Sequence, residues 1–217
     1  MAIREIPTKP YLDQKSGTAG LRKKVVVFQQ PHYLENFLQS IFDCSPELKG
    51  KTLVIGGDGR YHNRTAIQTA ISMAAANGVQ RIVVGQGGIL STPAVSHLIR
   101  QLGAAGGFVL TASHNPAGPD GDFGIKFNIA GGGQAGEGLT NRIYEHSKTL
   151  KSYRCHEGSY LDLDRRGLQT LNGSEIEIID CVDDYAQLMQ ELFDFDRIRE
   201  WLRKGGTLRF DAMHAVT

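Results

Sequence analysis

Side chains that could transfer a group between oxygen atoms gather in the segment TASHNPAGPDGDFGIKFN, residues 111–128. Ser113 closely follows the apolar run GGFVL, so the end of a strand could hold its hydroxyl exposed in a loop that two prolines restrict. That hydroxyl could act as a nucleophile, although a loop serine more commonly bonds a neighbouring backbone group. His114 could move a proton, or it could only orient the loop through a hydrogen bond.

The residue types favour phosphoryl transfer over acyl transfer. A nucleophile elbow, G-x-S-x-G, needs glycines where this chain has Thr111 and Asn115. Phosphoryl transfer has less need of a strong base and more need of cations around the phosphate oxygens, which Lys126 and Arg22 could supply. The segment GTAGLRKK, residues 17–24, combines these basic residues with small ones whose backbone can approach an anion. It could receive a phosphate, or its charges could form a solvated run before a strand.

The composition is that of an ordinary globular protein, for which small-molecule chemistry is the default expectation. The 217 residues include 24 basic and 23 acidic side chains mixed along the chain, so no basic stripe points to nucleic acid or to an anionic membrane. The three cysteines form no CxxC pattern, which predicts reduced structural thiols. The start MAIREIPTKPYLDQ has no apolar signal core, and no apolar run is long enough to span a bilayer. We therefore expect a cytoplasmic protein.

Strands and helices are predicted to alternate along the first half of the chain. Continuously apolar runs are typical of strands that are covered on both faces. These runs are residues 25–29, 53–56, 82–85, 107–111 and 125–129. Helical periodicity predicts one helix from Leu34, a second over 67–74 and a third over 95–102, with Thr92 as its cap and Pro93 in its first position. The alternation predicts an α/β layered domain whose ligand site lies at the carboxyl ends of strands, where Ser113 falls.

The second half of the chain is less regular. A glycine-rich break at 131–138 precedes a predicted helix over 139–150, and EIEIID at 175–180 alternates as a half-buried strand does. A helix over 185–192 is expected to close the first domain. After the RKGG break at 203–206, the run TLRFDA reads as a strand that begins a second, interrupted domain.

Four segments together resemble the amino-terminal part of the eukaryotic-type phosphoglucomutase family, in the α-D-phosphohexomutase superfamily. They are TASHNPAGPDGDFGIKFN, YLDQKSGTAGLRKKV at 11–25, GGDGRY at 56–61 and NGVQRIVVGQGGILSTPAV at 77–95. The resemblance covers essentially the whole chain. It implies a layered helix–sheet–helix first domain with a mixed sheet over residues 1–192, followed by a linker and the truncated start of a second such domain over 193–217.

The resemblance also implies a reaction. Such an enzyme interconverts glucose 1-phosphate and glucose 6-phosphate, with glucose 1,6-bisphosphate as activator and intermediate, and its full-length form is expected to be a monomer. Ser113 matches the phosphoserine, Lys126 the lysine beside it, and Arg22 the arginine that contacts the bisphosphate. Thr18 and His114 match supporting positions.

The metal site is only partly present in this sequence. The resemblance implies a Mg²⁺ ion held by a phosphate oxygen on Ser113 and by a D-G-D-G-D loop that this chain lacks. Asp58, in GGDGR, matches a different loop and is not its substitute. The loops that bind the sugar and the distal phosphate are expected beyond Thr217, so the chain alone is predicted to be inactive. The alternative is a non-catalytic interaction or regulatory relative, or a short isoform.

Overall fold

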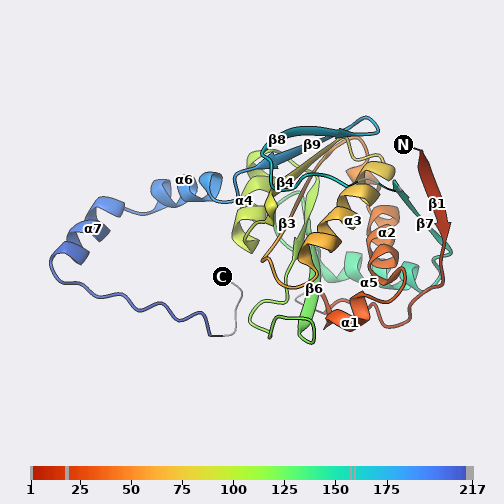
Figure 1. Ribbon diagram of the computed structural model, residues 1–217, viewed down its shortest axis with the longest axis horizontal. Helices are drawn as coiled ribbons and strands as arrows, with labels where there is room; N and C mark the ends of the chain where they lie inside the picture. The colour runs from red at the N-terminus through yellow and green to blue at the C-terminus, as the bar shows by residue number, and fades with distance from the viewer. Residues whose placement is uncertain (1, 18–19, 157, 159, 214–217) are drawn as a thin grey trace.

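The computed structural model describes residues 2–17, 20–156, 158 and 160–213. Within these residues a seven-stranded mixed sheet forms the centre of the molecule (Figure 1). Its strands, in the order in which they lie side by side, are β2 (Leu21–Lys24), β6 (Asp122–Ile129), β5 (Gly106–Leu110), β3 (Thr52–Gly57), β4 (Arg81–Ile89), β9 (Ser174–Ile179) and β8 (Gly167–Leu171). Strands β5, β3, β4 and β9 run parallel, whereas β2–β6, β6–β5 and β8–β9 are antiparallel pairs. A separate antiparallel pair joins β1 (Ile3–Pro7) to β7 (Ser152–His156).

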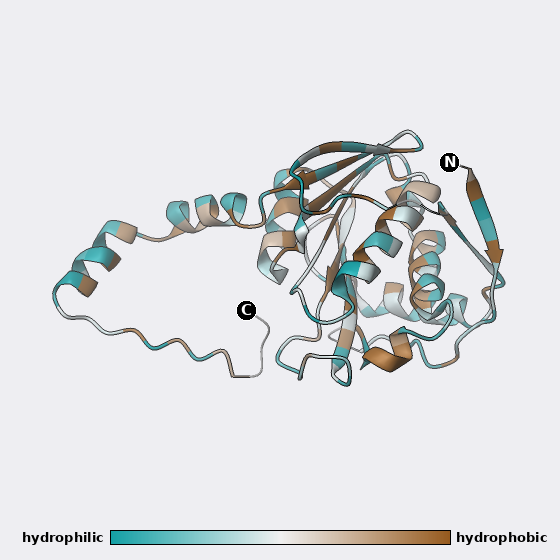
Figure 2. Ribbon diagram, in the orientation of Figure 1, coloured by the Kyte–Doolittle hydropathy of each residue, from teal (hydrophilic) through white to brown (hydrophobic). Residues whose placement is uncertain are grey.

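Helices cover both faces of the sheet, which confirms the predicted helix–sheet–helix layers. On one face, α2 (Tyr33–Cys44) and α3 (Asn63–Ala76) pack on the larger core, and α5 (Glu137–Ser147) packs on α2. On the other face, α4 (Thr92–Gln101) covers β3 and β5. Side chains alternate along β3, so that Leu53 and Ile55 join the larger core and Val54 joins the core under α4. The central strands are accordingly hydrophobic in colour (Figure 2).

Two local predictions within the layered domain were wrong. Residues 25–29 form no strand; the short helix α1 (Val25–Phe28) follows β2 instead and buries Val25 and Phe28 in the larger core. A short apolar run cannot by itself distinguish a strand from a buried helical turn. Thr92 is the first residue of α4 and not its cap, because the Ser91 hydroxyl accepts the capping hydrogen bond from the Ala94 amide at 3.3 Å. Pro93 therefore occupies the second position of the helix.

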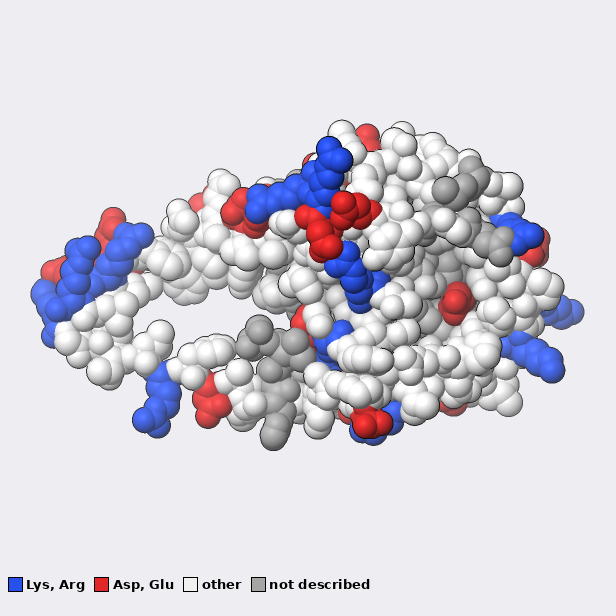
Figure 3. All heavy atoms as spheres, viewed as in Figure 1, with Lys and Arg blue, Asp and Glu red and all other residues white. Residues whose placement is uncertain are grey.

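The charged side chains are mixed in sign. On the face shown in Figure 3, basic and acidic groups lie side by side. The ion pairs of the chain include Arg64 with Asp164 and Arg166 with Asp180. None of the described helices is long and apolar enough to cross a bilayer. Cys44, Cys155 and Cys181 are free thiols, as predicted.

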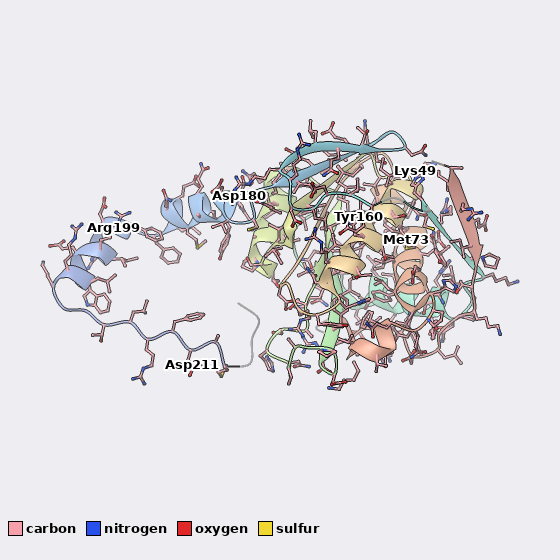
Figure 4. The ribbon with its side chains drawn as sticks, in the orientation of Figure 1. Lys49, Met73, Tyr160, Asp180, Arg199 and Asp211 are labelled. Atoms are coloured by element: carbon pink, nitrogen blue, oxygen red, sulfur yellow. The ribbon has the colours of Figure 1, made fainter. Side chains whose placement is uncertain are left out.

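The carboxyl-terminal segment leaves the layered domain. The short helix η1 (Pro46–Leu48) belongs to the layered domain, and α6 (Asp183–Leu192) packs against α4. The next helix, α7 (Phe195–Arg203), was not predicted; together with the extended residues that follow, it projects away from the domain (Figure 1). Figure 4 places Asp180 where this segment departs, Arg199 on α7 and Asp211 near its end. The run TLRFDA at 207–212 forms no strand among the described residues, because no neighbouring strand supplies its hydrogen bonds. The predicted helix over 139–150 ends at Ser147.

Candidate functional site

Ser113 lies on a loop at the carboxyl end of β5, as predicted. The loop, residues 111–121, joins β5 to β6 and is called the serine loop below. Ser113 is exposed and its backbone φ is +58°, in the left-handed region. That conformation costs a residue with a Cβ about 1–3 kcal/mol, so the surrounding structure must hold it there. The strain supports a functional reason for a serine at this position.

A buried network holds this backbone in place. The Arg60 side chain is fully buried and donates from Nε to both oxygens of Asp58 at 3.0 Å. Its Nη2 donates to the Ser113 carbonyl at 2.9 Å, and its Nη1 donates to the Asp122 carbonyl at 2.6 Å. Thr111 Oγ1 donates to Asp58 at 2.6 Å and accepts from the Ser113 amide at 2.9 Å. Both backbone polar groups of Ser113 are therefore occupied.

Parallel strands bring the members of this network together. β3 and β5 are parallel neighbours, so Asp58 and Thr111 each follow a strand that ends at the same edge of the sheet. The Asp58 amide donates to the carbonyl of Leu110, the last residue of β5, at 3.1 Å. The sequence analysis did not foresee a role for Arg60; the signal was a charged pair directly after a buried strand.

The two predicted cations, Arg22 and Lys126, lie on one face of the sheet. β2 pairs with β6 so that Arg22 is opposite Gly124, and Lys126 is two residues further along β6. The alternate residues Phe123 and Ile125 enter the larger core. Arg22 and Lys126 therefore point to the opposite face, the one on which α4 covers β3 and β5 but not β2.

Neither cation is neutralised by a carboxylate in an ion pair between described residues. Burial and the neighbouring Arg22 guanidinium lower the pKa of Lys126, while Asp58 opposes that shift. The Nε of Arg22 is buried without a hydrogen-bond partner, and its Nη1 lies 3.4 Å from the Asn115 side-chain oxygen. Two partly desolvated cations side by side favour the binding of an anion.

Gly20 brings the segment before β2 close to Lys126. Its φ is +87°, and a Cβ at this position would lie 2.7 Å from Lys126 Cγ and 2.5 Å from the Ile125 carbonyl oxygen. Only glycine fits so close to β6. Thr18, predicted to support substrate binding, lies outside the described residues. His114 is exposed, and no hydrogen bond of its ring is found within the described part of the chain, so both of its possible roles stay predictions.

The structure agrees with the exclusion of Asp58 as a metal ligand. Both oxygens of its carboxylate receive the Arg60 Nε–H, and Thr111 donates to it as well. No group of three or more His, Cys, Asp or Glu side chains suited to a metal ion occurs among the described residues. Because the Ser113 hydroxyl is exposed, it could carry a phosphate, and an oxygen of that phosphate could be one ligand of a metal ion. The other ligands would then be carboxylates from another segment.

An exposed nucleophile at a strand end suits the transfer of a phosphoryl group when two cations that form no ion pair between described residues lie on the neighbouring strands. Comparison with known proteins identifies the family. Residues 13–154 match the model described as phosphoglucomutase/phosphomannomutase, alpha/beta/alpha domain I. The chain belongs to this family. The matched range runs from before β2 to β7 and includes the serine loop and both cations.

The relatives of this phosphohexomutase domain come from distant organisms. A phosphoglucomutase from Rhizobium radiobacter is 55% identical over 215 residues, which are 99% of this chain and 40% of that protein. A cytoplasmic phosphoglucomutase from Mesembryanthemum crystallinum is 50% identical and is covered over 39% of its length. The open form of the exocytosis-sensitive phosphoprotein pp63/parafusin, a phosphoglucomutase from Paramecium, superposes with a TM-score of 0.92 at 46% identity, over 99% of this chain and 41% of that one. The chain thus spans about two fifths of its relatives and corresponds to their amino-terminal portion.

The first prediction concerns Lys126 and stability. We expect Lys126→Met to melt at the same temperature as the unsubstituted chain, or higher, at neutral pH, because the fold lowers the pKa of this lysine and so disfavours its charged form. The penalty is complete below the folded pKa of Lys126 and fades as the pH rises from that pKa to the higher pKa of the unfolded chain, so the advantage of methionine should shrink in alkali.

Thermal unfolding at neutral and alkaline pH checks this expectation. The exposed Lys49, which precedes β3, provides the control for the loss of a lysine at a position open to solvent. A clear fall in the melting temperature of Lys126→Met at neutral pH would instead assign Lys126 a structural role.

Proposed function

We propose that the chain is the phosphoserine-bearing part of a phosphoglucomutase, which interconverts glucose 1-phosphate and glucose 6-phosphate. The single observation that carries the proposal is the geometry of Ser113. Its strained backbone is held at both polar groups, and its exposed side chain lies at a strand end beside the strands of Arg22 and Lys126, which form no ion pair within the described part of the chain. The similarity to phosphoglucomutases supports the same substrates.

The transfer step is a displacement at phosphorus. A hydroxyl oxygen of the glucose monophosphate forms the new P–O bond, and the bond between phosphorus and Ser113 Oγ breaks to leave glucose 1,6-bisphosphate. The sugar hydroxyl loses a proton, which we assign to His114, the neighbour of Ser113 in sequence, and the Ser113 oxygen gains a proton as it leaves, so that the serine hydroxyl is restored. Lys126 offsets the negative charge on the phosphoserine, and Arg22 contacts the bisphosphate, with Thr18 in support. The return of the other phosphate to Ser113 completes the interconversion.

Mg²⁺, when bound through a phosphate oxygen on Ser113, would neutralise charge that develops during transfer. We also propose that the full-length protein is a cytoplasmic monomer that acts without nucleic acid or membrane. The name of the Mesembryanthemum crystallinum enzyme supports the cytoplasmic location. The intact serine loop argues against the alternative of a non-catalytic interaction or regulatory protein.

The proposal is tested with a full-length chimera, in which residues 1–217 are joined to the carboxyl-terminal remainder of the Rhizobium radiobacter enzyme. We expect Arg22→Met and Lys126→Met each to lower its turnover by about 100-fold or more, because each removes a cation that stabilises charge in the transition state. A coupled assay for glucose 6-phosphate formation from glucose 1-phosphate measures the effect.

Lys49→Met is the matched control and should leave turnover unchanged, since Lys49 lies away from the serine loop. Full activity of both site variants would contradict the assigned roles of Arg22 and Lys126. A folded chimera with no turnover even before substitution would favour the non-catalytic alternative.

A further inference from the structure

We infer that Arg60 is a positioning residue for phosphoryl transfer, which fixes the serine loop so that Ser113 is held ready before any phosphate binds. The inference rests on the proposed function, and it assigns to a buried guanidinium a role that is distinct from those of Arg22 and Lys126. The inference rests on the groups to which Arg60 donates hydrogen bonds and on the carboxylate that balances its charge.

Arg60 joins the two ends of the serine loop. One terminal nitrogen donates to the carbonyl of Ser113, near the start of the loop, and the other donates to the carbonyl of Asp122, the first residue of β6. The loop between these contacts is further closed by the Asp122 amide, which donates to the Pro116 carbonyl at 2.9 Å. A single rigid group therefore sets the distance between the two ends of the loop.

A closed ring of hydrogen bonds fixes the Ser113 backbone. It runs from Arg60 to Asp58, from Asp58 to Thr111, and from Thr111 to the Ser113 amide, while the Ser113 carbonyl returns the ring to Arg60. The peptide groups on both sides of the Ser113 Cα are thus held, and these are the groups that define its φ of +58°. Without the ring, a residue with a Cβ would relax from the left-handed region.

The charge of Arg60 is already balanced within the protein. Its Nε contacts both oxygens of Asp58, and its side chain has no exposed surface through which it could reach a substrate. Arg22 differs, because its Nε is buried without a partner and carries no ion pair among the described residues. Arg60 therefore acts on the serine loop, whereas Arg22 is available to an anion.

The geometry also explains why arginine stands at this position. Three nitrogens of one planar guanidinium donate in three directions, to a carboxylate and to two carbonyls. A lysine ammonium carries the same charge but has no fixed fork with which to hold both carbonyls at once. Arg60→Lys should therefore loosen the loop while it keeps the charge opposite Asp58.

Two substitutions test the ring at separate points. Arg60→Lys alters the ends of the loop, and Thr111→Val removes the hydroxyl that links Asp58 to the Ser113 amide while it leaves the Arg60–Asp58 pair in place. Thr111→Ser keeps that hydroxyl and serves as the rescue. Arg64→Met is the matched control. Arg64 lies on α3 and forms a bidentate pair with Asp164 at 2.7 and 2.8 Å, and among the described residues no hydrogen bond joins its side chain to the serine loop.

The variants are made in the full-length chimera, and hydrogen exchange of the serine-loop amides is measured with steady-state kinetics. In Arg60→Lys and Thr111→Val we expect exchange to rise about fivefold or more at the loop and not in β3 or β4, because each variant loses at least one hydrogen bond that holds the loop. We expect kcat to fall by up to about 100-fold with little change in KM, because a displaced Ser113 affects the transfer step more than sugar binding. Thr111→Ser and Arg64→Met should behave as the unsubstituted chimera does.

Unchanged kcat in both Arg60→Lys and Thr111→Val would overturn the inference, and so would a loss of kcat in Thr111→Ser equal to that in Thr111→Val. A fall in kcat that merely follows a fall in melting temperature, with uniform exchange across the sheet, would show that Arg60 is structural only. If the unsubstituted chimera takes no phosphate on Ser113 from glucose 1,6-bisphosphate, the proposed function itself fails, and this role of Arg60 fails with it.

Discussion

Replacement of Ser113 by glycine is expected to abolish turnover in the full-length chimera without loss of stability. The substitution removes the side-chain hydroxyl, which is the nucleophilic oxygen of residue 113. It also removes the Cβ that strains the backbone at a φ of +58°. Relief of this strain is opposed by the larger backbone entropy of glycine in the unfolded chain, so we expect a net stabilisation of roughly 0–1 kcal/mol. A variant that loses activity because it misfolds would instead be less stable than the unsubstituted protein.

Coupled kinetics and thermal unfolding together check this expectation. Asn172, in the turn between β8 and β9, has a φ of +49° and provides a control in which the same relief of strain occurs away from the serine loop. Asn172→Gly should retain full turnover, and Ser113→Ala should lose turnover as Ser113→Gly does. Substantial turnover by either Ser113 variant would show that another group carries the phosphate.

The second large effect concerns the 217-residue chain by itself, which we expect to show no measurable mutase turnover. It spans about two fifths of the length of its relatives. Transfer depends on positioning and on neutralisation of charge, and the described residues hold no carboxylate cluster suited to a metal ion. The serine loop alone has no means to hold a sugar while the bisphosphate reorients.

The purified chain and the chimera should therefore differ in one assay, with glucose 1-phosphate as substrate and both Mg²⁺ and glucose 1,6-bisphosphate present. The chimera is the positive control for the assay, and its Ser113→Gly variant is the negative one. If the chain alone turned over substrate at a rate comparable to that of the chimera, the domains that follow in its relatives would be unnecessary for the reaction.

The central sheet could be predicted from sequence because its strands are buried on both faces. Runs such as residues 53–56 and 107–111 are apolar throughout, and the structure places them in β3 and β5. β2 was missed because LRKK is a charged run and not an apolar one. Such a sequence can form a strand here because β2 lies at the edge of the sheet, where one partner strand suffices, and because α4 does not cover the face on which Arg22 lies. TLRFDA at 207–212 has the composition of a strand, but a strand forms only where another supplies hydrogen bonds.

The site was predictable to the extent that its motif is distinctive. Ser113 lies at the end of a predicted strand and Lys126 lies in the predicted run 125–129, whereas Arg22 lies on β2, a strand that was not predicted. Arg60 and Thr111 were missed because their work depends on burial and on hydrogen bonds between segments far apart in sequence. Arg60 contacts Ser113 and Asp122 across 53 and 62 residues, and no local pattern records such contacts.

The most direct test of the account is to locate the phosphate. The full-length chimera is incubated with glucose 1,6-bisphosphate and digested, and the peptides are mapped by mass, with the Ser113→Gly variant treated in parallel. The account predicts one phosphoryl group on the peptide that contains Ser113 in the unsubstituted protein, and none in the variant. A phosphate on a different residue, or equal incorporation into the variant, would contradict the assignment of Ser113 as the phosphoryl carrier.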